Sequence, residues 1–322
     1  MKFREWTLQF LLLAVSLLVS LGIAEAVLRI KNSSGKNYDI EMWRYAKELK
    51  QRSDIPELGH EHVPNREAVL QNIDIRINEV GLRGGPVPPY KPGTRRILIL
   101  GGSITLGWGV DEKDTVEARL QDMFRHDGQT VEVLNGGTGN YNAVRYVGLF
   151  LNRLTQIQPT DIIVHYFLRD AEVLPPGGGN ILLQHSQLAV TLWEAIHRQL
   201  DRSGEGALDA HYRDVYRPES EGYREMITSL DRLKSYADTH KIRVYLAMQP
   251  DVHNLTNYPF GYIHQRMAEV ARERGFRYID LLPIFSGQTP SSIWAMPGDP
   301  HPNALGHKLM ADAIYPALKL NE

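Results

Sequence analysis

The chain alternates short apolar runs with longer amphipathic ones, and this alternation constrains its fold more than any other feature. Four of the five apolar runs are continuous enough to be strands buried on both faces. Strands that alternate with helices form βαβ units, which build a parallel sheet with helices on both faces. We therefore predict a three-layer α/β/α fold with a central five-stranded, mostly parallel sheet. The expected strands are 96–100, 131–134, 161–167, 243–248 and 277–282, and the expected helices are 115–126, 143–154, 222–240, 262–274 and 304–318.

Composition excludes several classes of function. A chain of 322 residues is long enough to bury a full core. The formal net charge is −2, so no electrostatic argument favours nucleic acid as a partner. Cysteine is absent, which excludes a disulfide scaffold, a thiolate metal site and a cysteine nucleophile.

The N-terminus carries a long apolar segment. No residue from 6 to 24 is charged, and Lys2 and Arg4 precede this stretch, as in a signal sequence or a membrane anchor. About 20 apolar residues suffice to span a bilayer. Ala24-Glu25-Ala26 has the small-x-small form of a cleavage site. An uncleaved anchor, which we favour, a cleaved signal and a buried globular helix remain open, and the first two place the rest of the chain outside the cytoplasm.

Three segments are expected along the chain: a signal anchor or transmembrane helix at 1–29, a juxtamembrane lead-in at 30–93 and the α/β domain at 94–322. Prolines clustered between 86 and 92 give the end of the lead-in an extended character. The domain carries an insertion, 171–221, that departs from the alternation and contains an amphipathic helix near 181–200. A lid, a protein-partner surface, a membrane-facing element and simple loop elaboration all fit this insertion.

A serine follows the first expected strand, at the sheet edge where α/β folds bind ligands. Ser103 lies in the stretch Gly-Gly-Ser-Ile-Thr-Leu-Gly at 101–107. This stretch lacks the lysine of a P-loop and the G-x-G-x-x-G spacing of dinucleotide sites. It also differs from the G-x-S-x-G nucleophile elbow, because Thr105 stands in place of the second glycine. A serine hydroxyl becomes a nucleophile only when an oriented base takes its proton.

An Asp-Pro-His-Pro segment near the C-terminus offers such a base. Prolines at 300 and 302 fix their own φ and push Asp299 and His301 toward extended geometry. Residues two apart on an extended segment point to the same side, so Asp299 can hold one ring nitrogen of His301 while the other faces outward. Asn303 is placed to cap the following helix. Two ligands of a metal site would also fit this pair, but no further ligands follow at matching spacing, and we predict no metal.

Together these features resemble the SGNH (GDSL-type) hydrolase family, in its membrane-anchored bacterial branch. Gly101-Gly102-Ser103 corresponds to the G-D-S block of the family, with glycine at the aspartate position. The stretch 135–142 resembles the second block, the Asp-x-His pair resembles the C-terminal block, and 76–83 resembles the entry segment of anchored members. The resemblance covers about residues 94–320 and implies an SGNH, flavodoxin-like fold.

The resemblance also implies a catalytic triad. By the logic of the family, Ser103 attacks an ester carbonyl, His301 accepts and returns the proton, and Asp299 orients His301. No cofactor is implied. His165 and His307 are expected to be structural.

An oxyanion hole is implied as well. Its expected donors are the backbone amide of Ser103 and that of either Gly137 or Asn140, because the glycine spacing of the second block is displaced. The third block departs from the family, since Arg169 stands where an asparagine amide is expected. Arg169 can donate to the oxyanion in its place, bind an acidic substrate or point away.

The predicted function is that of a serine esterase or deacetylase acting on acyl esters of carbohydrate or lipid. Two alternatives remain open: an O-acyltransferase in surface-polysaccharide modification, and a non-catalytic assembly subunit on a degenerate SGNH scaffold. The expected partners are the acyl ester, the membrane through the N-terminal helix and proteins through the insertion, but not nucleic acid. The expected location is the inner membrane, with a single span and the catalytic domain in the periplasm.

Overall fold

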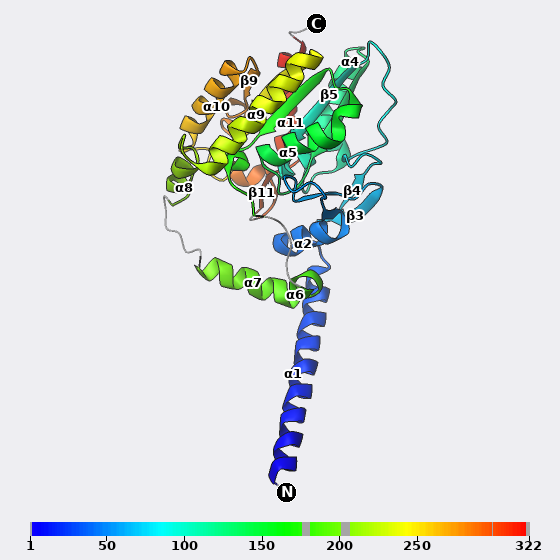
Figure 1. Ribbon diagram of the computed structural model, residues 1–322, viewed down its shortest axis with the longest axis vertical. Coiled ribbons are helices and arrows are strands. Elements are labelled where there is room, and N and C mark those ends of the chain that lie inside the picture. The colour runs from blue at the N-terminus through cyan, green and yellow to red at the C-terminus, as the bar shows by residue number, and fades with distance from the viewer. Residues whose placement is uncertain (1, 176–180, 201–206, 298, 320–322) are drawn as a thin grey trace. The chain divides into compact units, whose positions relative to one another are not determined.

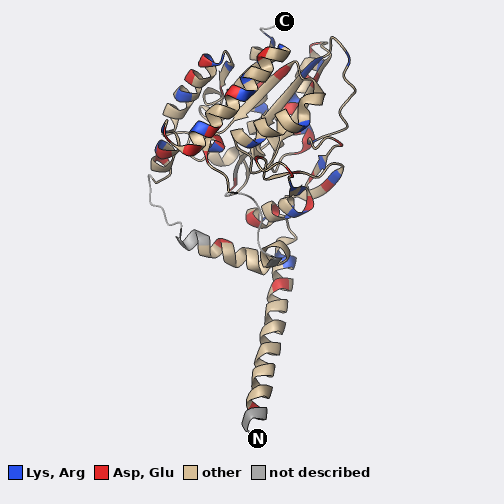
Figure 2. Ribbon diagram, in the orientation of Figure 1, with Lys and Arg blue, Asp and Glu red and all other residues tan. Residues whose placement is uncertain are grey.

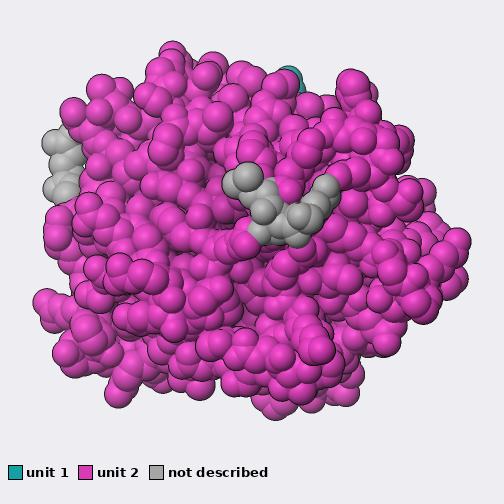
Figure 3. Space-filling view, turned by 90° about the horizontal axis from the view of Figure 1, so that it is seen from above, with its two compact units in different colours: residues 1–47, 178–202 teal, residues 48–177, 203–322 magenta. Residues whose placement is uncertain are grey.

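A computed structural model describes residues 2–175, 181–200, 207–297 and 299–319 of the chain (Figure 1). The chain divides into two compact units, which Figure 3 shows in different colours. Unit 1 holds residues 1–47 and 178–202, and unit 2 holds residues 48–177 and 203–322.

Unit 2 is built on a five-stranded parallel sheet with the strand order β6-β5-β7-β8-β9 (Figure 1). This order, 2-1-3-4-5 along the chain, is that of the flavodoxin-like folds, so the predicted fold class is confirmed. β8 has the predicted bounds, whereas β5 and β6 continue beyond the predicted strands into the glycines that follow them. The strands are β5 (Arg95–Gly101), β6 (Val131–Gly137), β7 (Asp161–Tyr166), β8 (Arg243–Met248) and β9 (Arg277–Asp280).

Helices cover both faces of this sheet, and alternate residues of β5 separate the two cores. Leu98 and Leu100 belong to the core shared with α5, α9 and α10, while Ile97 and Ile99 belong to the core shared with α4 and α11. A strand with apolar side chains in both directions is the pattern of a parallel sheet buried on both faces. The helices are α4 (Val116–His126), α5 (Ala143–Leu149, continued by a π-helical turn at Phe150–Leu154), α9 (Glu221–His240), α10 (Gly261–Glu273) and α11 (Ala304–Lys319).

The segment that precedes β5 forms two small antiparallel hairpins. β1 (Lys50–Arg52) pairs with β2 (His60–His62), and β3 (Arg66–Leu70) pairs with β4 (Ile73–Ile77). The β3–β4 turn consists of Gln71 and Asn72, both with positive φ (51° and 61°), as a two-residue hairpin turn requires. The hairpins belong to unit 2, and the proline cluster that follows them has no regular secondary structure.

Unit 1 contains α1 (Lys2–Asn32), α2 (Tyr38–Glu48, whose last residue is assigned to unit 2), α6 (Ile181–His185) and α7 (Gln187–Leu200). In the part of the chain that the structure describes, α1 is the one helix long and apolar enough to cross a membrane. The amphipathic helix predicted near 181–200 is present as α6 and α7. The rest of the described insertion forms α8 (Ala207–Val215) in unit 2.

Candidate active site

Ser103 begins α3 (Ser103–Leu106), a short helix that follows β5 directly. Glycine is required just before it: a Cβ on Gly101 would lie 2.1 Å from Thr105 Oγ1 and 2.9 Å from the His165 carbonyl oxygen. The helix ends at Gly107, whose φ of +79° favours glycine. The glycines around Ser103 therefore allow an abrupt turn from strand to helix at the sheet edge.

A buried arginine holds this helix in place. Arg83 is only 3% exposed, and its guanidinium donates to the carbonyls of Leu106, Gly107 and Val110. Carbonyls at the end of a helix lack partners within the helix, and a guanidinium supplies several donors in a fixed geometry. Arg83 thus fixes the position of Ser103 from the segment before β5.

Ser103, His301 and Asp299 form one hydrogen-bonded series. Ser103 Oγ lies 2.8 Å from His301 Nε2, and His301 Nδ1 lies 2.5 Å from Asp299 Oδ1. Asp299 is 1% exposed, and its Oδ1 also accepts from the backbone N–H of His301 at 3.1 Å. Because an ionised carboxylate can only accept, Nδ1 of a neutral imidazole carries the proton and Nε2 accepts from the serine hydroxyl.

The backbone of Asp299 and His301 is extended, because Pro300 and Pro302 restrict the residues that precede them to extended conformations. Asp299 and His301 lie on β11 (Asp299–Pro302), which pairs antiparallel with β10 (Trp294–Met296). Asn303 Oδ1 then accepts from the backbone N–H groups of Leu305 and Gly306, so Asn303 caps α11 as predicted.

Gln71 also contacts this hydrogen-bonded series. From the β3–β4 turn, its Nε2 donates to Asp299 Oδ2 at 3.2 Å, while His301 Nδ1 bonds to Oδ1 of the same carboxylate. Gln71 also fits closely against Gly109, where a Cβ would lie 2.5 Å from Gln71 Oε1. The sequence gives no signal for this role, because a glutamine in a hairpin turn matches no catalytic motif.

Gln71→Ala is expected to lower kcat for p-nitrophenyl acetate about 10-fold with little change in KM. The carboxylate loses one of its donors, and a hydrogen bond to a charged group contributes roughly 1.5–3 kcal/mol. The matched control is Asn72→Gly, which alters the same turn while tolerating its positive φ. An equal loss in Asn72→Gly would assign the effect to the turn and not to the contact with Asp299.

Gly137 and Asn140, the two candidates for the second oxyanion donor, differ in whether their backbone N–H groups are already bonded. The N–H of Gly137 donates to Asn135 Oδ1 at 3.0 Å, and a Cβ on Gly137 would lie 2.0 Å from the backbone nitrogen of Leu106. Gly137 therefore packs against α3 with its N–H already used, which argues against the expectation that it donates to an oxyanion. Asn140 is exposed with φ +62°, and its N–H has no acceptor among the described residues.

Arg169 follows β7, on the single turn Leu168–Ala171. Its side chain is 57% exposed, and its Nε donates to Glu172 Oε2 at 3.2 Å. The neighbouring Asp170 is buried, where it accepts from the Phe167 N–H and from Tyr146 Oη, and burial raises its pKa to about 8. Arg169 is thus paired with a carboxylate through Nε, and this pairing directs its side chain toward Glu172.

The two histidines expected to be structural are buried beside the serine helix and α4. His165 Nδ1 lies 3.1 Å from Thr105 Oγ1, and burial lowers the pKa of His165 to about 3. His307 Nδ1 accepts from the N–H of Val116 at 3.1 Å, and burial holds its pKa well below the usual range. Both imidazoles are therefore neutral at ordinary pH and act in packing.

A second Asp-x-His pair, Asp251 and His253, lies in the loop after β8, and its spacing in the sequence is the same as that of Asp299 and His301. His253 Nδ1 lies 2.8 Å from Asp251 Oδ1, and this hydrogen bond raises the pKa of the half-exposed imidazole. The His253 ring lies 6.1 Å from that of Trp294, whose Nε1 donates to the Val252 carbonyl. Because Trp294 pairs with Pro302 beside His301, His253 presents a protonatable group close to β11.

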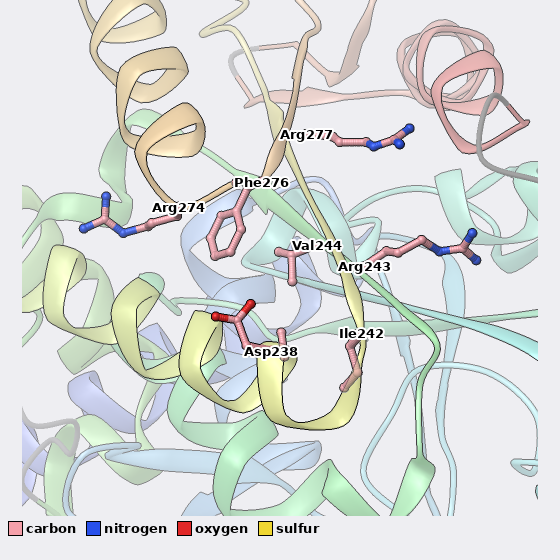
Figure 4. A pocket seen from close by; sticks show the side chains of 9 residues that line it. Asp238, Ile242, Arg243, Val244, Arg274, Phe276 and Arg277 are labelled. Atoms are coloured by element: carbon pink, nitrogen blue, oxygen red, sulfur yellow. The ribbon is translucent and has the colours of Figure 1, made fainter.

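A hollow of about 230 Å³ lies at the opposite edge of the sheet, where β8 and β9 begin. Figure 4 shows Arg274 pointing to one side of it and Arg243 and Arg277 to the other. Arg243 is paired with Asp161, and Arg274 with Asp231. Ser103 follows the carboxyl end of a parallel strand, so this hollow is separate from the candidate site. In the described part of the chain, no three His, Asp or Glu side chains gather as metal ligands would.

A comparison of the sequence with models of protein families agrees with the fold and with the geometry around Ser103. The model of the GDSL-like lipase/acylhydrolase family matches residues 99–309, which is most of the chain. The chain belongs to this family. As a GDSL-like acylhydrolase of the SGNH type it is an ester hydrolase, and its substrate is an acyl ester.

Several solved structures have a similar fold. TesA is 14% identical over 70% of this chain and 99% of its own, with a TM-score of 0.47. A putative acylhydrolase from Bacteroides fragilis is 14% identical over 73% and 91% (TM-score 0.42). The psychrotrophic esterase EstA from Pseudoalteromonas sp. is 15% identical over 71% and 100% (TM-score 0.45). Among curated proteins, none matches this chain.

Proposed function

We propose that this acylhydrolase acts through Ser103, His301 and Asp299 on acyl esters of carbohydrate or lipid outside the cytoplasm. The observation that carries the proposal is the unbroken hydrogen-bonded series from the serine hydroxyl through the imidazole to a buried carboxylate. Intact geometry of this kind also opposes a purely non-catalytic role on a degenerate scaffold.

The triad supports a two-step reaction. His301 Nε2 takes the proton of Ser103 as Oγ attacks the ester carbonyl, and the tetrahedral intermediate collapses when His301 returns that proton to the leaving alcohol. The acyl group then rests on Ser103. Water attacks this second ester with His301 again as the base, which releases the carboxylic acid and restores the serine. Asp299 stabilises the imidazolium that forms in each step.

The backbone N–H groups of Ser103 and Asn140 are the proposed oxyanion donors. Gly137 is not proposed, because its N–H is bonded to Asn135. Backbone donors of this kind hold the negative charge that develops on the carbonyl oxygen in the transition state.

Arg169→Ala is expected to change kcat by less than about threefold, because Glu172 holds the guanidinium in the resting enzyme. Removing a working oxyanion donor would instead cost about 100- to 1000-fold. The matched variant Glu172→Gln weakens the hold on Arg169 and leaves the arginine in place. A loss of 100-fold or more in Arg169→Ala would contradict this prediction and establish Arg169 as a donor in place of the asparagine of the family.

The N-terminal helix supports a membrane location. α1 is uninterrupted from Lys2 to Asn32, and Glu25, inside the small-x-small sequence, accepts hydrogen bonds from residues 186–188. Cleavage after Ala26 would remove this carboxylate from its partners. We infer that α1 is retained as a single-span anchor of the inner membrane, with the catalytic domain in the periplasm.

The purified full chain in detergent is expected to release p-nitrophenol from p-nitrophenyl acetate and to deliver the acetyl group to water. Adding an oligosaccharide acceptor should leave the yield of free acetate unchanged, as measured by mass spectrometry of the products. Acetylated oligosaccharide formed at the expense of acetate would identify the O-acyltransferase alternative. Absence of p-nitrophenol release at any pH from 6 to 9 would contradict the proposed triad chemistry.

A further inference from the structure

Within unit 1, the first turn of α7 is bound to a carboxylate of α1. Glu25 accepts from the backbone N–H groups of Gln187 (3.0 Å) and Leu188 (2.8 Å) and from Ser186 Oγ (2.9 Å). The first N–H groups of a helix have no partners within that helix. Glu25 therefore acts as the N-terminal cap of α7 from a distant part of the sequence.

Further hydrogen bonds reinforce this junction. Arg29 Nη2 donates to the His185 carbonyl at 2.9 Å, and Asn32 Nδ2 donates to Gln187 Oε1 at 3.0 Å, with both amide side chains buried. Trp43 Nε1 of α2 donates to the Leu183 carbonyl at 2.6 Å. Several independent contacts thus attach α6 and α7 to the end of α1.

The junction lies where the apolar part of α1 ends. The 19 residues from 6 to 24 carry no charge and rise about 28 Å as a helix, close to the roughly 30 Å of a bilayer's hydrocarbon core. Figure 2 shows this uncharged length of α1 and the charged residues that follow it. Glu25 and Arg29, paired at 2.7 Å, would then lie at the boundary between hydrocarbon and headgroups.

α7, which begins at this junction, exposes an apolar face. Leu192, Trp193 and Ile196 are 54%, 48% and 56% exposed, and their spacing places them side by side on the helix. Val190 is buried. Large contiguous apolar surface is unusual in contact with water, and tryptophan is enriched where membranes meet water.

We propose that α7 is an interfacial helix, which lies on the outer surface of the membrane that α1 spans and inserts Leu192, Trp193 and Ile196 among the lipids. This inference rests on the proposed anchoring by α1. A helix with one strongly apolar face binds in this way, and Figure 1 shows α7 running across the end of α1 and not alongside it. The chain enters α6 from unit 2 and returns to unit 2 after α7, so the catalytic unit gains a second attachment to the lipid surface.

The absence of cysteine from the chain permits a direct test. Single cysteines at Trp193 and Ile196 carry a nitroxide in the full chain, reconstituted in vesicles of phosphatidylethanolamine and phosphatidylglycerol. Collision rates with oxygen, which prefers lipid, and with a water-soluble nickel chelate then report the surroundings of each probe. Leu13→Cys marks the middle of the proposed anchor, and Thr239→Cys, exposed on α9, marks water.

We expect at least a fivefold lower nickel-to-oxygen ratio at 193 and 196 than at 239, and a still lower ratio at 13. A water-like ratio at 193 and 196 with a lipid-like ratio at 13 would overturn the interfacial helix and leave the anchor intact. A water-like ratio at 13 would overturn the anchor itself. Low collision rates with both reagents at 193 and 196 would show that these residues are buried against protein, either within one chain or against a second copy of it. That result would also overturn the proposal.

Glu25→Ala in the Ile196→Cys background tests the junction. Loss of the cap should release α7 and raise the nickel accessibility of the probe severalfold. The matched control is Glu5→Ala near the other end of α1, which should leave the accessibility unchanged. Equal accessibility in Glu25→Ala and its parent would overturn the assignment of Glu25 as the residue that holds α7 at the membrane.

Discussion

Ser103→Ala is expected to lower kcat/KM for p-nitrophenyl acetate by at least about 1000-fold, because the hydroxyl that lies 2.8 Å from His301 Nε2 is the proposed nucleophile. Only water activated by the remaining site would react, and in serine hydrolases this residual catalysis is small. Loss of one hydroxyl on a partly buried side chain should leave the thermal unfolding temperature within about 2 °C of the parent. The assay therefore separates lost chemistry from lost folding.

A matched surface variant and a covalent probe complete this experiment. Ser235→Ala removes an exposed serine of α9 and should retain full activity. An alkyl p-nitrophenyl phosphonate should add its phosphonyl group to the parent protein and leave Ser103→Ala unlabelled, as read by intact mass. Full activity or continued labelling in Ser103→Ala would assign the nucleophile to another residue.

Asp299→Asn is expected to lower kcat by about 1000- to 10,000-fold with little effect on folding. An asparagine amide can donate to His301 Nδ1, which favours the tautomer that carries its proton on Nε2. That nitrogen then donates to Ser103 and no longer accepts its proton. The shape of the buried side chain is nearly unchanged, so the loss would report the direction of one hydrogen bond.

The second Asp-x-His pair provides the control for this variant. Asp251→Asn makes the same chemical change at the same spacing, beside His253 instead of His301. We expect a loss of less than about 10-fold, since no contact joins His253 to Ser103 in the described structure. A comparable loss in both variants would mean that the pair after β8 takes part in the reaction.

The strands and the Asp-His pair were predictable because local chemistry determines them. Parallel strands that are buried on both faces read as nearly continuous apolar runs, and β8 has the predicted bounds. Prolines at 300 and 302 restrict their neighbours to extended geometry wherever the chain places them. The same reasoning could not find Gln71, because its contact with Asp299 joins residues 228 apart in the sequence.

The proposed oxyanion donors could not be chosen from the sequence, because the choice depends on contacts made in the folded chain. Gly137 and Asn140 looked equivalent because both lie in one glycine-rich turn. The distinction arises from the Asn135 side chain, which takes the N–H of Gly137, and from α3, which packs against Gly137. The orientation of Arg169 likewise depends on Glu172 three residues later, a pairing that many single turns allow and few require.

The β3–β4 hairpin and the segment after it lie outside the region that the family model matches, yet they contact the proposed active site. Gln71 and Arg83 both precede residue 99, where the match to the family model begins, yet Gln71 contacts Asp299 and Arg83 donates to the carbonyls at the end of the helix that carries Ser103. A chain trimmed to residues 99–309 would keep the proposed nucleophile and base but lose the contacts of Gln71 and Arg83. The part of the chain that supports the proposed site is therefore longer than the part that the family model matches.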